Sequence, residues 1–570
     1  MNRPAPQRHF LPAQLEVKSW SDLEPWLDSL DGRKITSSSE FRQWLNDLSE
    51  TEAFIEEDAA WRYIKMTIDT RDEQLTQSYQ WFVSEIQPKI SPFNDRFNRM
   101  LMAQPFRSEF TGRAFEIYFR QIEKEIALYR ENNIPLQSEV AQKAQEYGAT
   151  IGGMAVEVDG SKLTLPQAAA ELQKTDRQHR EAVWKATQEV RMSVHQKLDE
   201  LFTQLIELRT TIASNAGFKN FRDYKFEAMG RFDYTKEDCF DFHKSIAQSI
   251  KPLTGAFLRE RWSQLGVDAL RPWDLAVDPT GKEPLKPFST ADELLQKSVQ
   301  VFGMVDSFFG ECLSTMNSMG YLDLASKEGK APGGYNYPLY ESGVPFIFMN
   351  AVGTQRDMVT MMHEGGHAVH SFLTQDLELT SFKSCPSEVA ELASMTMELL
   401  TMDYWDVFYP DPETLKRAKK DHLQDILSVL PWIAIVDRFQ HWVYEHPHHT
   451  LEERKAEWKS IHHEFTEDVV DYSGCEDAVN YMWQKQLHIF EVPFYYIEYG
   501  MAQLGAIAIW RNYKHDPKKA VAQYKEALTL GYTRSIPEIY EAAGIRFDFS
   551  AGYVSELAAF IQQQLSDLDS

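Results

Sequence analysis

The sequence predicts a mainly α-helical fold, and two observations support this. Several long segments place apolar residues three or four positions apart, the spacing of one face of a helix, as in residues 113–133 and 195–215. Alternating, strand-like patterns are few and short, and they predict two β-hairpins, one in residues 152–169 and one in residues 333–354. We therefore expect a helical protein that contains small β-sheets.

Length, charge and cysteine content narrow the class of protein further. A chain of 570 residues can bury a large core and form more than one subdomain. The net charge of −26 argues against nucleic acid and anionic membranes as partners, and it would favour cationic or neutral peptides. The N-terminal residues lack the apolar core of a signal peptide, no apolar run could span a bilayer, and the four cysteines include no Cys-x-x-Cys pair. We therefore expect a cytoplasmic protein.

The segment DMVTMMHEGGHAVHSFLT, residues 357–374, predicts an amphipathic helix with two faces of different chemistry. Thr354 and Asp357 have the spacing of a capping box, which would start this helix. An apolar stripe at helical spacing predicts a face packed on the core, and a separate histidine stripe would face a site. The apolar stripe contains Met358, Met362, Val369 and Leu373, and the histidine stripe contains His363, His367 and His370.

The first two histidines form a His-Glu-x-x-His pattern. Side chains at i and i+4 lie one above the other on a helix, so the imidazoles of His363 and His367 can bind one Zn²⁺ ion. Glu364 lies one residue round the helix, where it can act as general base on a water beside the metal. Gly365 and Gly366 each cost about 1 kcal/mol relative to alanine, which suggests that another element or a substrate backbone approaches closely there. Because a histidine pair alone is more often structural, the interpretation depends on a third ligand.

Candidates for the third ligand lie in SCPSEVAELASMTMELL, residues 384–400, which predicts a second helix beginning near Pro386. Glu388, Glu391 and Glu398 share one side of this helix. On so acidic a protein such a stripe is most often a solvated face, but here apolar residues flank it on nearly every side. Carboxylates in so apolar a helix are more easily explained if they are paired or bound to a metal.

Together the two motifs resemble peptidase family M3, specifically its bacterial oligoendopeptidase F branch, whose relatives include thimet oligopeptidase and neurolysin. The family pattern has a glycine before the second histidine, matched by Gly366, and a third-ligand glutamate in a Glu-x-x-Ser stretch, matched by Glu391 and Ser394. The resemblance implies that Glu391 rather than Glu388 binds zinc. It also makes Glu398, two helical turns further on, a candidate to orient a ligating imidazole.

The resemblance also implies the fold and its organisation. Members of family M3 have a zincin-type fold in which two helical halves flank a deep substrate channel, with a small β-sheet near the active site. By this layout we expect an N-terminal helical segment at 1–104, an oligoendopeptidase F-like helical region at 105–199 and the catalytic domain at 200–570. The predicted hairpin at 333–354 would lie beside the site, where a strand edge could pair with an extended peptide. A purely structural hairpin would explain the same pattern.

A second group of candidate residues lies in residues 486–510. Pro493 can open a helix there, and Tyr496 and Tyr499 would share one of its faces. Aromatic stripes of this kind are usually core, yet a phenol can also donate a hydrogen bond to a developing oxyanion. Family M3 places a histidine and tyrosines in such a segment, facing the metal, which implies catalytic roles for His488, Tyr496 and Tyr499.

The function that follows is zinc-dependent hydrolysis of internal peptide bonds in short, unstructured oligopeptides. One zinc ion per chain would be held by His363, His367 and Glu391, and Glu364 would take a proton from the attacking water and return it to the leaving amine. Two alternatives stay open: a zinc carboxypeptidase-type exopeptidase, and a catalytically inactive peptide- or metal-binding protein on the same fold. The histidines of residues 431–449 are interpreted as core and surface residues rather than a second metal site, because their neighbours supply no matching carboxylate pattern.

Overall fold

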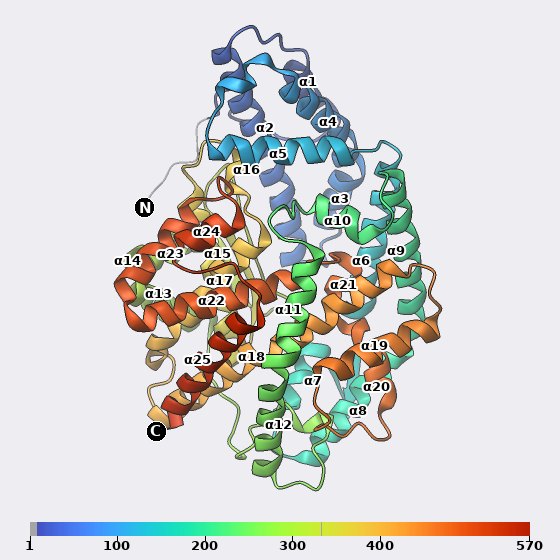
Figure 1. Cartoon of the computed structure of the whole chain (residues 1–570), viewed down its shortest axis with the longest axis vertical. Coiled ribbons are helices and arrows are strands. Elements are labelled where there is room, and N and C mark those ends of the chain that lie inside the picture. The colour runs from blue at the N-terminus through green and yellow to red at the C-terminus, as the bar shows by residue number, and fades with distance from the viewer. Residues whose placement is uncertain (1–7, 332, 570) are drawn as a thin grey trace. The chain divides into compact units, whose positions relative to one another are not determined.

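The computed structural model describes residues 8–331 and 333–569, and in these ranges the chain is mainly α-helical with two small β-sheets (Figure 1). The predicted fold class is confirmed in this respect. The chain divides into two compact units, each assembled from separate stretches: unit 1 contains residues up to 131, 286–415 and 502–547, and unit 2 contains residues 132–285, 416–501 and those from 548 onward. No helix in the described ranges combines the length and the apolar character that crossing a membrane requires.

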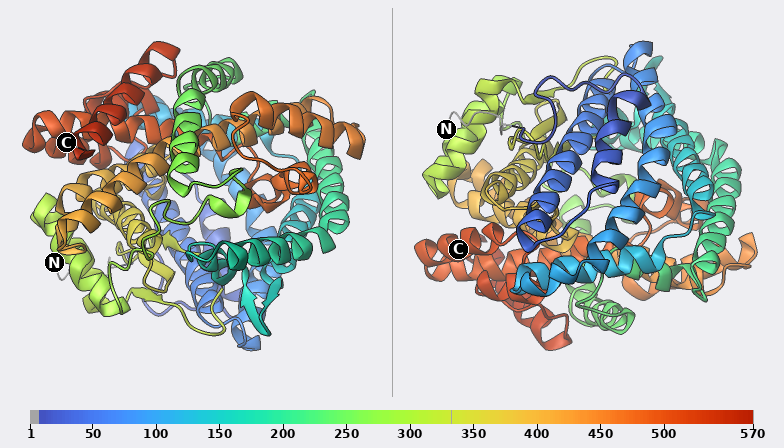
Figure 2. Two further views of the ribbon diagram at one scale, coloured as in Figure 1. Left: turned by 90° about the horizontal axis from the view of Figure 1, so that it is seen from below. Right: turned by 90° about the horizontal axis from the view of Figure 1, so that it is seen from above.

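The N-terminal part of unit 1 is a group of helices around an aromatic core. Its core includes the fully buried side chains of Phe41 and Trp44 and the nearly buried ring of Phe97. Helix α1 packs against both α2 and α4, as Figures 1 and 2 show. Burial of these large apolar surfaces holds the helices together. The elements are α1 (Trp20–Asp31), α2 (Ser38–Ile68), α3 (Glu73–Trp81), a π-helical turn (Phe82–Ile86), α4 (Gln87–Ala103), a 3-10 turn (Pro105–Glu109) and α5 (Arg113–Leu128).

The rest of unit 1 contains a three-stranded sheet and seven further α-helices assigned wholly to it in the described ranges. The strands are β3 (Leu322–Ala325), β4 (Tyr335–Tyr337) and β5 (Phe346–Ala351). The helices are α13 (Ala291–Val305), α14 (Ser307–Met319), α15 (Gln355–Thr374), α16 (Thr380–Lys383), α17 (Ser387–Thr401), α23 (Pro517–Thr529) and α24 (Ile536–Ala542), and a 3-10 turn (Met402–Val407) follows α17.

The sheet has the order β3-β5-β4, with β5 parallel to β3 and antiparallel to β4. The predicted hairpin at 333–354 is therefore confirmed as β4 and β5, whereas the parallel strand β3 was not predicted. Strand β5 sits between the other two, and its first four residues are buried. Both β4 and β5 contact α15, so this sheet lies directly against the helix that carries the His-Glu-x-x-His pattern.

The start of α15 is fixed by the predicted capping box. The Asp357 backbone N–H donates to Thr354 Oγ1 over 3.2 Å. In return, Asp357 Oδ2 accepts hydrogen bonds from the backbone N–H groups of Val352, Gly353 and Thr354 at 2.9–3.0 Å. These bonds satisfy donors at the helix N-terminus and attach it to the chain that leaves β5.

Unit 2 is helical apart from one hairpin in its described residues. The hairpin is formed by β1 (Ala155–Val158) and β2 (Ser161–Thr164), and it turns at Asp159 and Gly160, both with positive φ, as the Asp-Gly pair predicts. The helices are α6 (Asn133–Gly152), α7 (Leu165–Glu171), α8 (Arg177–Ser193), α9 (His195–Asn215), α10 (Phe221–Ala228), α11 (Lys236–Ser249), α12 (Lys251–Leu265), α19 (Leu451–Phe465), α20 (Glu476–Asn480), α21 (Leu487–Glu491) and α25 (Ala551–Asp569), with 3-10 turns at Pro272–Asp274 and Met482–Lys485. Two more helices, α18 (Pro412–Glu445) and α22 (Ile497–His515), contain residues assigned to both units.

A buried ion-pair cluster holds part of unit 2 together. The carboxylate of Asp274 is fully buried and accepts hydrogen bonds from Arg177 over 2.7 Å and from Arg180 over 2.9 Å. Both arginines belong to α8, so the cluster joins this helix to the 3-10 turn at Pro272–Asp274. Each buried charge is paired, which offsets the cost of removing it from water.

Candidate active site

The apolar face of α15 is packed into the core of unit 1, as predicted. Met358, Met362 and Val369 have no exposed surface. Leu373 is only partly buried, so the prediction of a core position is wrong at the C-terminal end of the stripe. Helix α17 packs closely against α15 over much of its length. This pair of helices carries all the residues predicted to bind the metal.

The side chains of His363, His367 and Glu391 converge on one point. One potential ligand atom from each residue lies within 4.8 Å of the other two. Glu391 Oε2 lies 3.3 Å from His363 Nε2 and 3.7 Å from His367 Nε2. The two imidazole rings are nearly perpendicular, with their centroids 4.9 Å apart. Two imidazole nitrogens and one carboxylate oxygen form a donor set that suits a catalytic Zn²⁺ ion, and the residues present therefore fit this cofactor.

Contacts behind two of the three side chains, His363 and Glu391, set their orientation. Glu398 Oε1 lies 2.7 Å from His363 Nδ1, so the carboxylate accepts the Nδ1 proton and leaves Nε2 directed at Glu391. The Ser394 hydroxyl donates to Glu391 Oε2 over 3.1 Å. Contacts of this kind fix the tautomer and angle of a metal ligand. Glu398 therefore lies against the imidazole of a candidate ligand, as expected from the sequence.

The two glycines of α15 are explained by neighbouring helices. A Cβ atom on Gly366 would lie 2.6 Å from Ser394 Cα and 2.8 Å from the Ala393 carbonyl oxygen, both in the backbone of α17. A Cβ atom on Gly365 would lie 2.4 Å from the ring of Phe302 on α13. Of the two explanations that the sequence left open, the approach of another element therefore accounts for both glycines.

Glu364 is buried beside the three converging side chains. Its side chain is 7% exposed, and Asn336 on β4 donates from Nδ2 to its backbone carbonyl over 3.2 Å. Burial raises the pKa of the Glu364 carboxyl to about 7. For its neighbour His363, burial lowers the pKa, but the hydrogen bonds and charges of Glu391 and Glu398 outweigh this and raise it well above the ordinary value. The cluster thus contains carboxylates and imidazoles that interact strongly.

The structure bears on two sequence expectations about neighbouring residues. His370 was expected to face the site, but its Nε2 lies 3.2 Å from Cys385 Sγ, and it is not part of the converging group. It lies seven residues from His363, which places it about 10 Å further along the helix axis. The group that could hold a metal contains Glu391 and not Glu388, in agreement with the choice made between them.

The second predicted group, His488, Tyr496 and Tyr499, lies in unit 2. His488 Nε2 is 3.4 Å from the Tyr499 hydroxyl, and the His488 and Tyr496 rings have centroids 4.8 Å apart, so the three side chains form one cluster. The predicted helix start at Pro493 is wrong, because α22 begins at Ile497. Phe494 has φ of 67°, which is incompatible with a right-handed helix, and Tyr496 therefore precedes α22. The orientation of this cluster toward the metal stays a prediction.

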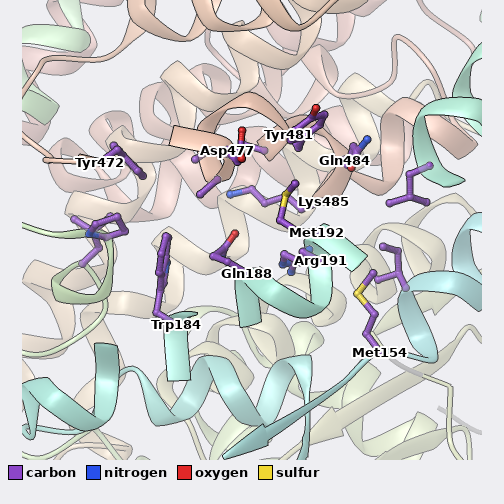
Figure 3. Close-up of a pocket in the computed structure, with 16 residues that line it drawn as sticks. Met154, Trp184, Gln188, Arg191, Met192, Tyr472, Asp477, Tyr481, Gln484 and Lys485 are labelled. Atoms are coloured by element: carbon purple, nitrogen blue, oxygen red, sulfur yellow. The ribbon is translucent and has the colours of Figure 1, made fainter. Parts of the chain in front are cut away.

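Unit 2 also contains a pocket of about 180 Å³ that involves none of the predicted residues. Its walls combine α8 with residues between Tyr472 and Lys485 (Figure 3). Trp184 and Tyr481 supply aromatic surface, and Arg191 supplies a cation. The lining residues of the pocket include no group of paired carboxylates or imidazoles that would suggest chemistry, and none of them belongs to the histidine and glutamate cluster of α15 and α17.

Comparison with known families agrees with the geometry of α15 and α17. The model of peptidase family M3 matches residues 171–559, and that of the peptidase M3 N-terminal domain matches residues 13–129. A helical fold with a His-Glu-x-x-His helix and a glutamate from a second helix is that of a metallopeptidase. The chain belongs to peptidase family M3, and the predicted family is confirmed.

Individual relatives are oligoendopeptidases. The chain is 22% identical over 352 residues to an oligoendopeptidase F homolog of Lactococcus lactis subsp. lactis (strain IL1403), covering 59% of this chain and 55% of that protein. It is 21% identical over 424 residues to the plasmid oligoendopeptidase F of Lactococcus lactis subsp. cremoris, covering 72% of this chain and 66% of that protein. The matches thus span a little over half to two thirds of these curated relatives.

Solved structures resemble the chain over nearly its whole length. The structure of PZ peptidase A with inhibitor 2 has a TM-score of 0.92 and 28% identity, covering 97% of this chain and 98% of the other. A structure assigned as an oligoendopeptidase F has a TM-score of 0.91 and 28% identity, with the same coverage. The predicted zincin-type peptidase fold is therefore confirmed, while the substrate channel stays a prediction.

Proposed function

We propose that the chain is a zinc-dependent endopeptidase that hydrolyses internal peptide bonds of short, unstructured oligopeptides. The observation that carries this proposal is the convergence of His363, His367 and Glu391 within 4.8 Å, next to the buried carboxylate of Glu364. Two imidazoles and one carboxylate leave a coordination position open, which catalytic zinc sites require. Imidazole donors favour Zn²⁺ over Mg²⁺ and Ca²⁺, and two histidines with one glutamate are a ligand set of catalytic zinc sites. The relatives named oligoendopeptidase F support the same activity.

When bound, the ion would polarise a water molecule and the scissile carbonyl. The residues of the chain supply the proton transfers and the orientation. Glu364 takes the proton of the attacking water as general base and then gives it to the nitrogen of the leaving amine. Glu398 holds the Nδ1 proton of His363, and Ser394 holds one oxygen of Glu391, so that both ligands keep their angle.

We further propose that His488, Tyr496 and Tyr499 donate hydrogen bonds to the oxygen of the scissile carbonyl as negative charge develops on it. A phenol is a neutral donor, so its hydrogen bond strengthens as the carbonyl oxygen becomes an anion. The three side chains already lie together, with His488 Nε2 at 3.4 Å from the Tyr499 hydroxyl. The edge strand β4 is a candidate to pair with an extended substrate backbone. A cytoplasmic location and the division of the chain at residues 104 and 199 also stay predictions.

The test is cleavage of an internally quenched peptide of about ten residues that is blocked at both ends, with bound metal measured by mass spectrometry. We expect wild-type chain to cleave it and Glu364→Gln to lose at least about 100-fold in kcat while keeping its zinc, because only the general base is removed. Glu391→Gln should lose zinc, whereas Glu388→Gln, a buried glutamate one turn earlier on α17, should keep it.

The same experiment, repeated with a peptide of the same sequence that has free ends, separates the alternatives. A zinc exopeptidase would cleave only the peptide with free ends and leave the blocked peptide intact. A binding protein would carry zinc and cleave neither peptide. Full activity in Glu364→Gln, or an active wild-type chain without zinc, would contradict the mechanism.

A further inference from the structure

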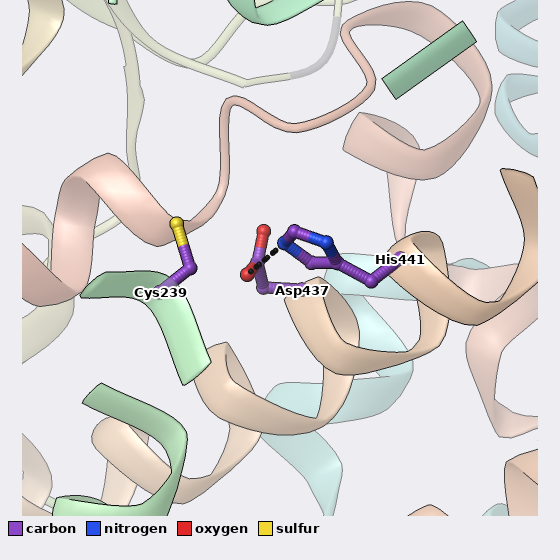
Figure 4. A group of neighbouring side chains, drawn as sticks. All are labelled: Cys239, Asp437 and His441. Atoms are coloured by element: carbon purple, nitrogen blue, oxygen red, sulfur yellow. Dashed lines mark ion pairs between the residues drawn. The ribbon is translucent and has the colours of Figure 1, made fainter. Parts of the chain in front are cut away.

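Unit 2 contains a second group of metal-type donors, Cys239, Asp437 and His441 (Figure 4). One potential ligand atom from each lies within 4.8 Å of the other two. Cys239 comes from α11, and Asp437 and His441 come from α18. None of the three side chains has exposed surface. Beside the thiol, one carboxylate oxygen of Asp437 and both ring nitrogens of His441 are buried without a hydrogen bond from the described residues, which needs a physical explanation.

The distance between Asp437 and His441 suits two ligands of one ion. His441 Nε2 lies 3.3 Å from Asp437 Oδ2, but the ring nitrogen makes no hydrogen bond in the described part of the chain. Two ligands bound to a tetrahedral Zn²⁺ ion at about 2.0–2.1 Å lie about 3.4 Å apart. At the proposed active site, His363 Nε2 and Glu391 Oε2 are also 3.3 Å apart. Asp437 Oδ1 is also buried and accepts no hydrogen bond from the described residues.

His243 supports the group from α11. It lies one helical turn after Cys239, and its Nε2 is 2.8 Å from Asp437 Oδ2, within hydrogen-bond distance. The two helices therefore each present a pair of donors at i and i+4 to the same volume, Cys239 with His243 and Asp437 with His441. A hydrogen bond from a buried imidazole to a ligand carboxylate is a typical outer contact of a metal site.

Charge balance favours a bound cation. Asp437 brings a negative charge into a site that is otherwise lined by imidazoles and aromatic rings, including those of Phe226, Phe240 and Phe494 around His441. Arg222 is paired elsewhere, with Asp223 and Glu445. A divalent ion would balance one thiolate and one carboxylate with no charge left over.

We propose that Cys239, Asp437 and His441 bind a second zinc ion, which joins α11 to α18 as a structural site, with His243 orienting Asp437. Thiolate, imidazole and carboxylate together are a zinc donor set, and a thiolate disfavours Mg²⁺ and Ca²⁺. The three ligands have no exposed surface, so a bound ion would not meet a substrate and would act structurally. From the sequence we expected one zinc per chain, because the neighbours of the histidines in 431–449 supply no matching carboxylate pattern. Cys239 lies on another helix, α11, and only the folding of the chain brings it next to Asp437 and His441.

The test counts zinc per chain in the full-length protein after loading and dialysis. We expect two zinc ions per wild-type chain, one in Cys239→Ser and one in Glu391→Gln. Cys312→Ser is the matched control, since Cys312 is an equally buried cysteine in unit 1, and it should keep two. A wild-type chain with a single ion, kept in Glu391→Gln and lost in Cys239→Ser, would support this site and contradict the proposed active site.

Cobalt substitution tests the site in the unmutated chain, so the result does not depend on whether a variant folds. The proposed active site contains no sulfur ligand, whereas a Co²⁺ ion bound by Cys239 would give a sulfur-to-cobalt charge-transfer band in the near ultraviolet. We expect this band in the wild-type chain. Its absence, with one zinc per chain that disappears in Glu391→Gln, would overturn the proposal and make the group a buried aspartate–histidine network.

Discussion

The sharpest prediction concerns Gly366, because the structure gives the magnitude of the perturbation. In Gly366→Ala the new methyl group would lie 2.6 Å from Ser394 Cα, where an ordinary contact is at least 3.4 Å. The obstacle is backbone, so a side-chain rotation cannot relieve it. Helices α15 and α17 would have to move apart by about 0.8 Å, or distort by a similar amount.

This displacement acts directly on the proposed metal site. α15 carries His363 and His367, and α17 carries Glu391, so a shift between the helices changes the distances among the three ligands. Metal–ligand distances tolerate about 0.2 Å, well below the required shift. We expect zinc affinity and kcat/KM to fall by at least about 10-fold. The overpacking cost of about 1–3 kcal/mol should exceed the gain of about 1 kcal/mol from replacing a helix glycine by alanine.

The assay is zinc competition titration together with cleavage of the blocked peptide, and circular dichroism checks that the variant is folded. Gly365→Ala is the matched control, because it is the adjacent helix glycine and its methyl group would meet the Phe302 side chain rather than α17. It should lower stability with little effect on zinc affinity. Wild-type zinc affinity and activity in Gly366→Ala would refute the reasoning.

Three further predictions follow from other parts of the structure. Glu398→Ala removes the carboxylate that accepts the Nδ1 proton of His363, and zinc affinity should fall about 10–100-fold in a competition titration. Asp274→Ala removes the buried carboxylate that pairs with the buried guanidinium of Arg180 and the partly exposed one of Arg177, and the free energy of unfolding should fall by about 3–5 kcal/mol in denaturant titration. Burial lowers the pKa of His449 to about 4, and its Nε2 accepts a hydrogen bond from Arg454 over 2.9 Å, so the neutral ring is the stabilising form. Its stabilising contribution is present above pH 6.5 and should be lost as the pH falls toward 4, by at most about 1.4 kcal/mol per pH unit, and His449→Gln should flatten this slope in melting experiments.

Each of these predictions has a control in the same chain. Glu388→Ala should leave zinc affinity near that of the wild type, although Glu388 is also a buried glutamate of α17. Asp69→Ala breaks an exposed pair with Arg71 and should cost less than about 1 kcal/mol. His446→Gln changes an exposed imidazole near His449 and should leave the pH slope unchanged. Equal effects of a variant and its control would contradict the corresponding prediction.

The sequence predicted the local parts of the candidate site well. Helical spacing located α15, the Thr354–Asp357 capping box marked its start, and the His-Glu-x-x-His pattern gave two of the three converging residues. These signals depend on contacts within a few residues, which the sequence specifies directly. Choosing Glu391 over Glu388 needed the family resemblance as well, because both glutamates lie on the same side of one helix.

Errors of the sequence analysis came from contacts between distant residues. Periodicity assigned His370 to the site because it measures angle around a helix and ignores distance along the axis. Strand β3 was not predicted, since its pairing with β5 is parallel and its partner lies over twenty residues away. Cys239 carries no local sign of a partner, and only the packing of α11 on α18 brings it to Asp437 and His441.

The sequence by itself determined which segments are helices, where the proposed metal-binding helix starts and which chemistry its polar face offers. Hydrogen bonds and side-chain spacing within one or two turns are enough for that. The tertiary structure alone decided how closely α15 and α17 approach and that a second group of donors exists. Those outcomes depend on the shapes of surfaces formed by residues far apart in the chain, and a single apolar stripe does not specify its packing partner.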